Sequence, residues 1–142
     1  MSDAAGIVFL VGRVVFALPF LMAGVAFHFG QGAQAEGYAK GVGFPFPRLA
    51  GWPAGLWLLA GAGSIAVGVW PDLGSLMIAL WAIPTIFWFH AFWRMEGEQR
   101  MMQQLLFLRN VMFFGAALAL FAVFAALGPE APFTPVDPLF RF

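Results

Sequence analysis

Cysteine is absent from this chain of 142 residues. Its absence excludes disulfide bonds, thiolate metal sites, iron–sulfur ligation and any thiol–disulfide relay within the chain. Charge is also scarce: charged residues are 10% of the sequence, and seven Lys plus Arg balance seven Asp plus Glu. A nucleic-acid partner needs a basic surface that replaces counterions, so the zero net charge argues against such a partner.

Apolar residues dominate what remains. Hydrophobic residues make up 62% of the chain, against roughly 45–50% in an ordinary soluble domain. Phe occurs 18 times, Met seven times and Trp six times. This composition suits a lipid-facing helix bundle with aromatic anchors at the membrane interfaces.

Long apolar stretches alternate with short polar connections. A helix needs roughly 20 apolar residues to cross about 30 Å of hydrocarbon, and none of the stretches has the alternation of a strand. We therefore predict an all-α fold. The chain is expected to be a polytopic membrane protein, an antiparallel bundle of four transmembrane helices over about 4–29, 50–70, 73–93 and 105–127.

The first apolar stretch has a second interpretation. Arg13, a hydrophobic run and then Ala33-Gln34-Ala35 resemble a signal peptide with an A-x-A cleavage site. Against this, the apolar run begins before Arg13, is long for a signal peptide, and has Asp3 where Lys or Arg is expected. We favour a membrane span.

Glycine and proline mark the connections. Their density in residues 30–49 predicts a shaped loop or re-entrant turn, which is either a plain connector or a cap on the bundle. The tight turn at residues 70–72 predicts a hairpin of the second and third spans. Ala60 and Ser64 have the spacing for close helix packing in lipid, and Pro84 is expected to kink the third span.

The membrane domain is expected to cover residues 1–127, and a proline-rich tail residues 128–142. Four prolines predict that the tail is extended rather than helical. It either lies against a partner or the membrane surface, or frays. With four spans both termini share one side, and the excess of Lys and Arg on the other side predicts cytoplasmic long connections.

The few polar groups inside the apolar spans gather at the end that holds the two long connections. His28, His90, Arg94, Arg109 and Asn110 are expected to converge there. A charged side chain at mid-depth costs at least about 2.5 kcal/mol, so Arg109, one turn inside the fourth span, should face the bundle or a wet cavity.

Each of these residues also has a simpler structural interpretation. Arg94 is typical of a solvated topology charge, and His28 at a helix end is typical of an interface residue. His90 and Arg94 are four apart and would share a helix face. Arg13 lies deeper and nearer the opposite side, where we expect it to bond to carbonyls freed near Pro19 or to a carbonyl of another span.

Recognisable catalytic and metal motifs are missing. Two His with scattered Glu do not form a three-ligand zinc site, and HExxH, G-x-S-x-G and P-loop patterns are absent. We therefore expect no metal, and haem, which needs axial ligands at matched depth, is a disfavoured alternative. A quinone-type headgroup fits better, because its ring stacks on Trp or Phe and its oxygens accept bonds from His90, Arg109 or Asn110.

Several segments carry a resemblance to a known family. They are GRVVFALPFLMAGVAFHF in the first span, the GFPFP turn, HAFW at the end of the third span and FLRNVMFFGAAL in the fourth. Over roughly residues 6–125 the chain resembles the DoxX family of small bacterial four-helix membrane proteins. Its best-matched positions are His90, Phe92, Trp93, Arg109 and Asn110.

The resemblance implies a link to membrane redox chemistry. One branch of the family is a subunit of a thiosulfate:quinone oxidoreductase, and another belongs to a membrane-associated oxidoreductase complex. This chain departs from the family in having Arg109 where Lys is frequent, and in lacking an acidic residue within the second span. Both departures put an inherited proton-transfer or substrate role in question.

Together these observations predict a multi-pass protein of the bacterial inner membrane. The first functional hypothesis is an oxidoreductase component or accessory subunit near the quinone pool. The alternative is a non-catalytic subunit that docks a larger membrane complex through its tail and small-residue faces; a transporter or small-lipid carrier is a distant third. The candidate ligand-binding residues are His28, His90, Trp93, Arg94, Arg109 and Asn110.

Overall fold

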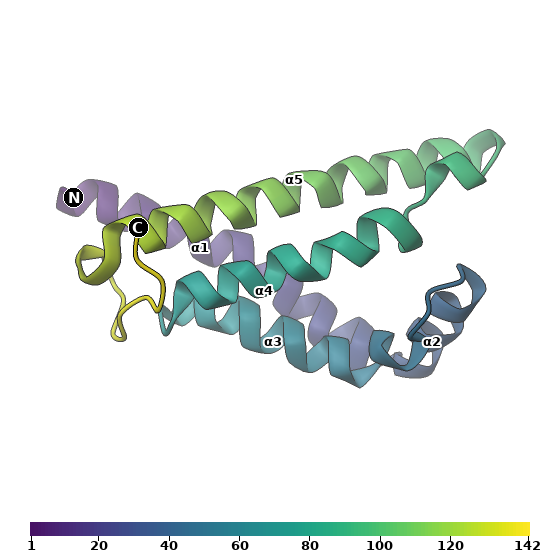
Figure 1. The fold of residues 1–142 in the computed structure, drawn as a ribbon, viewed down its shortest axis with the longest axis horizontal. Helices are drawn as coiled ribbons and strands as arrows, with labels where there is room; N and C mark the ends of the chain where they lie inside the picture. The colour runs from purple at the N-terminus through teal and green to yellow at the C-terminus, as the bar shows by residue number, and fades with distance from the viewer.

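Long helices lie side by side along one axis in the computed structural model, which describes residues 1–142, and both chain ends lie at the same end of the bundle (Figure 1). The structure has helices and no strand, only one isolated bridge between Val69 and Val136, so the all-α prediction is confirmed. The α-helices are α1 (Asp3–Met22), α2 (Gly32–Gly41), α3 (Trp52–Val67), α4 (Pro71–Pro84) and α5 (Gly97–Leu127). The short elements are η1 (Ala23–Phe29), η2 (Pro47–Ala50), η3 (Thr85–Phe89), η4 (Phe92–Arg94) and η5 (Gly128–Glu130).

Three helical units are long and apolar enough to cross a membrane. They cover Asp3–Phe29, Pro71–Arg94 and Gly97–Glu130. The expected second span differs, because α3 has only 16 residues and is about 24 Å long at 1.5 Å per residue. The fourth expected span begins earlier than predicted, since α5 starts at Gly97 instead of near Leu105.

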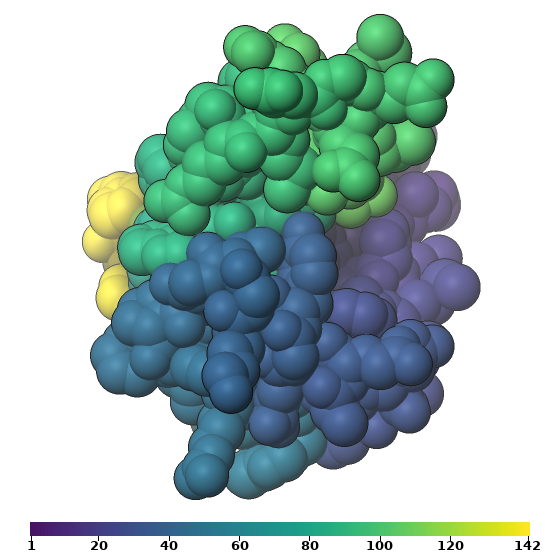
Figure 2. All heavy atoms as spheres, turned by 90° about the vertical axis from the view of Figure 1, so that its right-hand side faces the viewer, coloured from purple at the N-terminus to yellow at the C-terminus, as the bar shows by residue number.

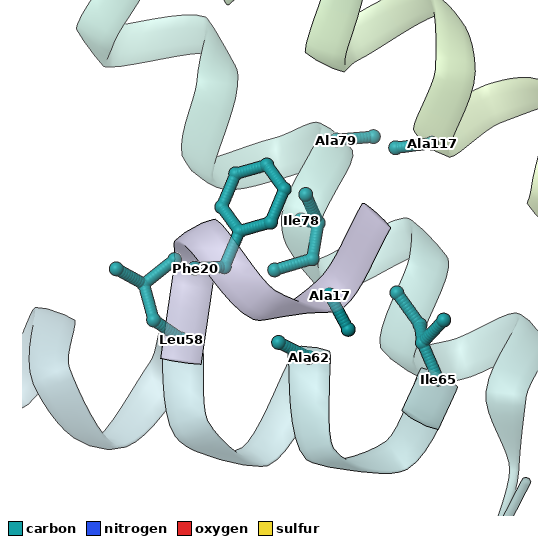
Figure 3. Packing of buried hydrophobic residues seen from close by; sticks show 8 residues of the cluster. All are labelled: Ala17, Phe20, Leu58, Ala62, Ile65, Ile78, Ala79 and Ala117. Atoms are coloured by element: carbon teal, nitrogen blue, oxygen red, sulfur yellow. The ribbon is translucent and has the colours of Figure 1, made fainter. Parts of the chain in front are cut away.

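Side chains from all four long helices meet in one buried cluster (Figure 3). Phe20 and Ala17 of α1 pack against α3 and α4, while Ala79 of α4 points toward Ala117 of α5. Small residues bring the backbones together, as is usual where helices associate in lipid. The cluster consists of Ala17, Phe20, Leu58, Ala62, Ile65, Ile78, Ala79 and Ala117.

The hairpin of α3 and α4 has the closest helix contact. A Cβ added at Gly74 would lie 2.5 Å from the carbonyl oxygen of Gly61 and 2.7 Å from Oγ of Ser64. Ser64 therefore packs as predicted, but its partner positions are Gly61 and Gly74, and Ala60 is exposed on the outer face. The predicted hairpin is confirmed, because α3 ends at Val67 and α4 begins at Pro71.

Two helices change from α to π geometry on the side away from the termini. The π segment η1 begins at Ala23, four residues after Pro19 of α1, and the π segment η3 directly follows Pro84 at the end of α4. Proline removes a backbone donor and disturbs the turn that precedes it, and π segments are frequent at functional sites. The feature observed at Pro84, where a kink was predicted, is the change from α to π geometry in the residues that follow it.

The connection at residues 30–49 is more ordered than predicted. Residues 32–41 form the helix α2, and only the part after it is a loop with a short 3-10 turn. The Tyr38 hydroxyl donates to the carbonyl of Phe89 at 2.8 Å, and the ring of Phe44 lies 5.4 Å from that of Phe89. The connection is therefore a cap that is bonded to η3, the segment that continues α4.

The proline-rich tail folds back on the bundle. It contains the 3-10 turn η5 and a turn at residues 131–133, and no longer helix. Arg13 donates to the carbonyls of Pro132 and Phe133 at 3.3 and 2.5 Å, and the amide of Phe140 donates to Asp72 at 2.6 Å. The expectation that Arg13 bonds to a carbonyl near Pro19 or on another span was wrong, since its partners lie in the tail.

Candidate functional site

A cavity of about 830 Å³ lies between the helices at the end away from the termini. The helices α3, α4 and α5, both π segments and α2 contribute to its walls. Figure 2 views this end and shows the α2 connection in blue below the start of α5 in green and beside the first helix in purple. Its volume and largely apolar lining are those of a site for a small molecule.

His28 is held by the backbone of the α2–α3 connection. It lies in η1, is 7% exposed, and its Nδ1 is 2.6 Å from the carbonyl oxygen of Ala50. A carbonyl only accepts, so Nδ1 carries the hydrogen and the neutral ring keeps Nε2 as an acceptor. The ring also lies 6.3 Å from Trp81, edge to face.

His90 lines the same cavity and lies directly after η3, the segment that continues α4. The backbone leaves helical geometry at this residue, and its Nδ1 is 2.9 Å from the side-chain oxygen of Gln103 on α5. The hydrogen bond joins the end of η3 to α5 and orients the imidazole. His90 and Arg94 do not share a helix face as predicted, because the helix ends at Phe89.

Arg109 lines the cavity from α5 and has no hydrogen-bonding or ionic partner within the chain. The only ion pair in the structure joins Arg141 to Asp137, and the nearest partner of Arg109 is the ring of Phe113, 5.9 Å from its Cζ. Arg109 lies 12 residues inside α5, deeper in the helix than the predicted single turn. A cation in this position is available to an oxygen-bearing ligand.

Asn110 supports the wall instead of forming it. The side chain is 2% exposed and donates to the carbonyl of Leu106 at 2.8 Å. Its oxygen lies 3.3 Å from the hydroxyl of Thr85, which does line the cavity. The structure thus places Asn110 one residue layer behind the site.

Two of the candidate residues lie outside the cavity. Trp93 is exposed and packs against Phe92 and Phe107, with ring centroids 5.4 and 5.9 Å away. Arg94 is exposed and bonds to the carbonyl of Val42 at 3.4 Å. Both therefore belong to the polar connection between η3 and α5. Sequence spacing alone did not distinguish this connection from the residues that line the cavity.

Several lining residues were not predicted. Gln103 was assigned to a polar connection, yet α5 starts early enough to turn its side chain toward His90. Tyr38 and Gln34 reach the cavity only because residues 32–41 form a helix. The only sequence signal for this part of the cavity wall was the single Tyr of the chain, which lies next to a glycine-rich segment.

The match to a family model decides the classification. The DoxX family model matches residues 8–91, from the second turn of α1 to just past η3, and this range includes both imidazoles of the cavity. This chain belongs to the DoxX family. It is a multi-pass membrane protein, because its long apolar helices agree with membership of this membrane family.

Searches among curated proteins and solved structures gave no match for this DoxX protein. The lining contains imidazole, amide, hydroxyl and guanidinium groups but no carboxylate, and no cluster of three or more metal-ligating side chains occurs in the chain. Such a lining suits an organic headgroup with oxygen atoms and an apolar body.

Proposed function

We propose that this DoxX protein is an inner-membrane component that binds a quinone-type headgroup, as part of an oxidoreductase or as its accessory subunit. The observation that carries the proposal is the convergence of His28, His90 and Arg109 on one largely apolar cavity. Aromatic rings offer stacking surfaces to a flat ligand ring, and Trp81 lies against His28.

The path of the chain supports four membrane crossings. The helices α1 and α4 run in the same direction along the bundle (Figure 1). A chain that crosses with α1 must return before it crosses again with α4, and α3 is the only helix that connects the two ends. A short span is tolerated through local thinning of the bilayer and through its flanking residues.

Arg109 gives the proposal its electrostatic basis. A guanidinium within an apolar span requires polar partners. Arg109 is exposed and has only the ring of Phe113 beside it, with no hydrogen-bonding or ionic partner in the chain. A quinone oxygen that accepts a hydrogen bond from Arg109 would satisfy this requirement, with the ring lying between the aromatic walls. The amide of Gln103 is a second donor in the same cavity.

Ligand binding to the purified protein tests the proposal. Trp57 and Trp81 line the cavity, so their fluorescence should be quenched when a short-chain benzoquinone binds. We expect Arg109→Gln to weaken binding about 10-fold or more, because hydrogen bonds to charged groups contribute roughly 1.5–3 kcal/mol. Arg94→Gln is the matched control and should leave binding unchanged. Equal affinities in the wild type and Arg109→Gln would remove the proposal.

The contacts of the tail weaken the alternative of a docking subunit. The segment that was expected to reach a partner bonds to Arg13 and Asp72 of its own bundle. A partner subunit would therefore meet the outer surface of a folded tail. Co-purification of another membrane subunit that is lost on deletion of residues 128–142 would favour this alternative.

A further inference from the structure

The polar groups of the cavity differ in whether they are already satisfied. The hydroxyl of Tyr38 donates to Phe89, and the indole of Trp57 donates to the carbonyl of Met77 at 2.7 Å. The hydroxyl of Thr85 donates to the carbonyl of Ala82 at 2.7 Å. The hydrogens of these three donors are occupied within the chain, so none of them is free to donate to a ligand.

The two imidazoles are occupied on one nitrogen only. Nδ1 of His28 faces the carbonyl oxygen of Ala50, and Nδ1 of His90 faces the amide oxygen of Gln103. Both partners are acceptors, so each neutral ring carries its hydrogen on Nδ1. The nitrogen that remains on each ring, Nε2, is then an acceptor.

The hydrogen-bond donors and the hydrogen-bond acceptors of the cavity interact differently with the oxidised and the reduced form of a quinone. The oxygens of a quinone and of its hydroquinone both accept hydrogen bonds, so Arg109 and Gln103 serve both forms. Only the hydroquinone carries O–H groups that can donate to a lone pair. An Nε2 lone pair that faces a quinone oxygen has no hydrogen between the two acceptors, which is unfavourable.

We propose that the cavity binds the hydroquinone form of its ligand more tightly than the quinone form, with the Nε2 atoms of His28 and His90 as acceptors for ring hydroxyls. This inference rests on the proposed function, since it concerns the same cavity and ligand class. A neutral hydrogen bond corresponds to roughly a 3–10-fold change in affinity. We expect about 10-fold tighter binding of the hydroquinone.

The preference has a thermodynamic consequence. A ligand couple whose reduced form binds more tightly becomes a stronger oxidant when bound. For a two-electron couple a 10-fold ratio corresponds to about 30 mV. A site of this kind stabilises the reduced product when a partner protein delivers electrons to the quinone.

Three ligands of similar size and shape test the inference under anaerobic conditions: a short-chain benzoquinone, its hydroquinone and the dimethyl ether of that hydroquinone. The ether has oxygen acceptors but no O–H donor. We expect the hydroquinone to bind about 10-fold more tightly than the other two. Equal or tighter binding of the quinone, or binding of the ether as tight as that of the hydroquinone, would overturn the inference. Failure of all three to bind would instead refute the proposed function.

A pair of variants examines the orientation of His90. Gln103→Leu removes the acceptor that holds the hydrogen on Nδ1, so the ratio of hydroquinone to quinone affinity should fall about threefold. The loss of the amide as a ligand donor affects both forms and cancels in this ratio. Gln104→Leu is the matched control, because Gln104 is exposed and outside the cavity. A ratio that is unchanged in Gln103→Leu would contradict the inference.

Discussion

The guanidinium of Arg13 donates to the backbone carbonyl of Phe133 at 2.5 Å, across a sequence separation of 120 residues. Arg13 is 1% exposed and lies in the first long helix. Asp72, 0% exposed, accepts from the backbone of Phe140 in the same way. The two buried charges of the bundle are therefore both bonded to the tail, which makes the tail a structural part of the membrane domain.

Removal of residues 128–142 should destabilise the protein strongly. It would leave Arg13 and Asp72 buried without these partners, and removing one partner of a buried charge costs roughly 3–5 kcal/mol. Thermal unfolding in detergent measures the effect. In an Arg13→Met background the same deletion should cost less, because that charge is no longer there to be orphaned.

Arg141→Gln serves as the control for this experiment. Arg141 and Asp137 are 63% and 56% exposed, and exposed pairs contribute less than about 1 kcal/mol. The variant should unfold close to the temperature of the wild type. A deletion that shifts unfolding no more than Arg141→Gln would show that the tail does not stabilise the bundle.

Gly74→Ala should open the hairpin of α3 and α4. The added methyl group would lie 2.5 Å from the carbonyl oxygen of Gly61, and overpacking of this kind costs typically about 1–3 kcal/mol. Gly115→Ala on α5 is the matched control, with no atom within 4 Å of its added Cβ. It should be neutral or stabilising by up to about 1 kcal/mol, since alanine favours helix more than glycine does. Equal unfolding temperatures for the two variants would argue against the close contact.

Tyr38→Phe should loosen the cap over the cavity. The variant keeps the ring but loses the bond to the carbonyl of Phe89, a net contribution of roughly 0.5–1.5 kcal/mol. Since the chain has no native cysteine, a Cys at position 103 reports access to the cavity through its maleimide labelling rate. We expect a rise of about 3–10-fold. A rate unaffected by Tyr38→Phe would mean that α2 does not control access.

Single cysteines also test the four membrane crossings. An impermeant reagent applied to intact cells should distinguish two sets of positions. Lys40→Cys and Glu98→Cys should label from one side of the membrane, and Ser2→Cys and Arg141→Cys from the other. Labelling of positions 40 and 98 from opposite sides would refute the topology.

Much of the fold follows from local sequence physics. Long apolar stretches predict helices, and the Trp70–Asp72 turn predicts the hairpin, because both signals lie within a few residues of the structure that they specify. The helix α2 was missed because its glycines suggest a loop. Its order comes instead from tertiary contacts of Tyr38 and Phe44 with Phe89, which no local pattern reveals.

The site was predictable only in part. His28, His90 and Arg109 stand out because polar groups are costly inside apolar spans, and the structure brings all three to one cavity. The tail partners of Arg13 were missed because they lie about 120 residues away. Trp93 and Arg94 were predicted to line the site but lie outside the cavity, because η3 ends at Phe89 and the chain leaves helical geometry at His90.

Photochemical labelling with an azido-substituted short-chain quinone shows directly whether the cavity binds a quinone headgroup. We expect unmodified quinone to compete with the label. It should be recovered on residues of the cavity walls, within the segments 23–29, 80–90 and 103–109. Labelling confined to the outer faces of the helices or to the tail, or labelling that excess quinone does not suppress, would show that the cavity is not a quinone site.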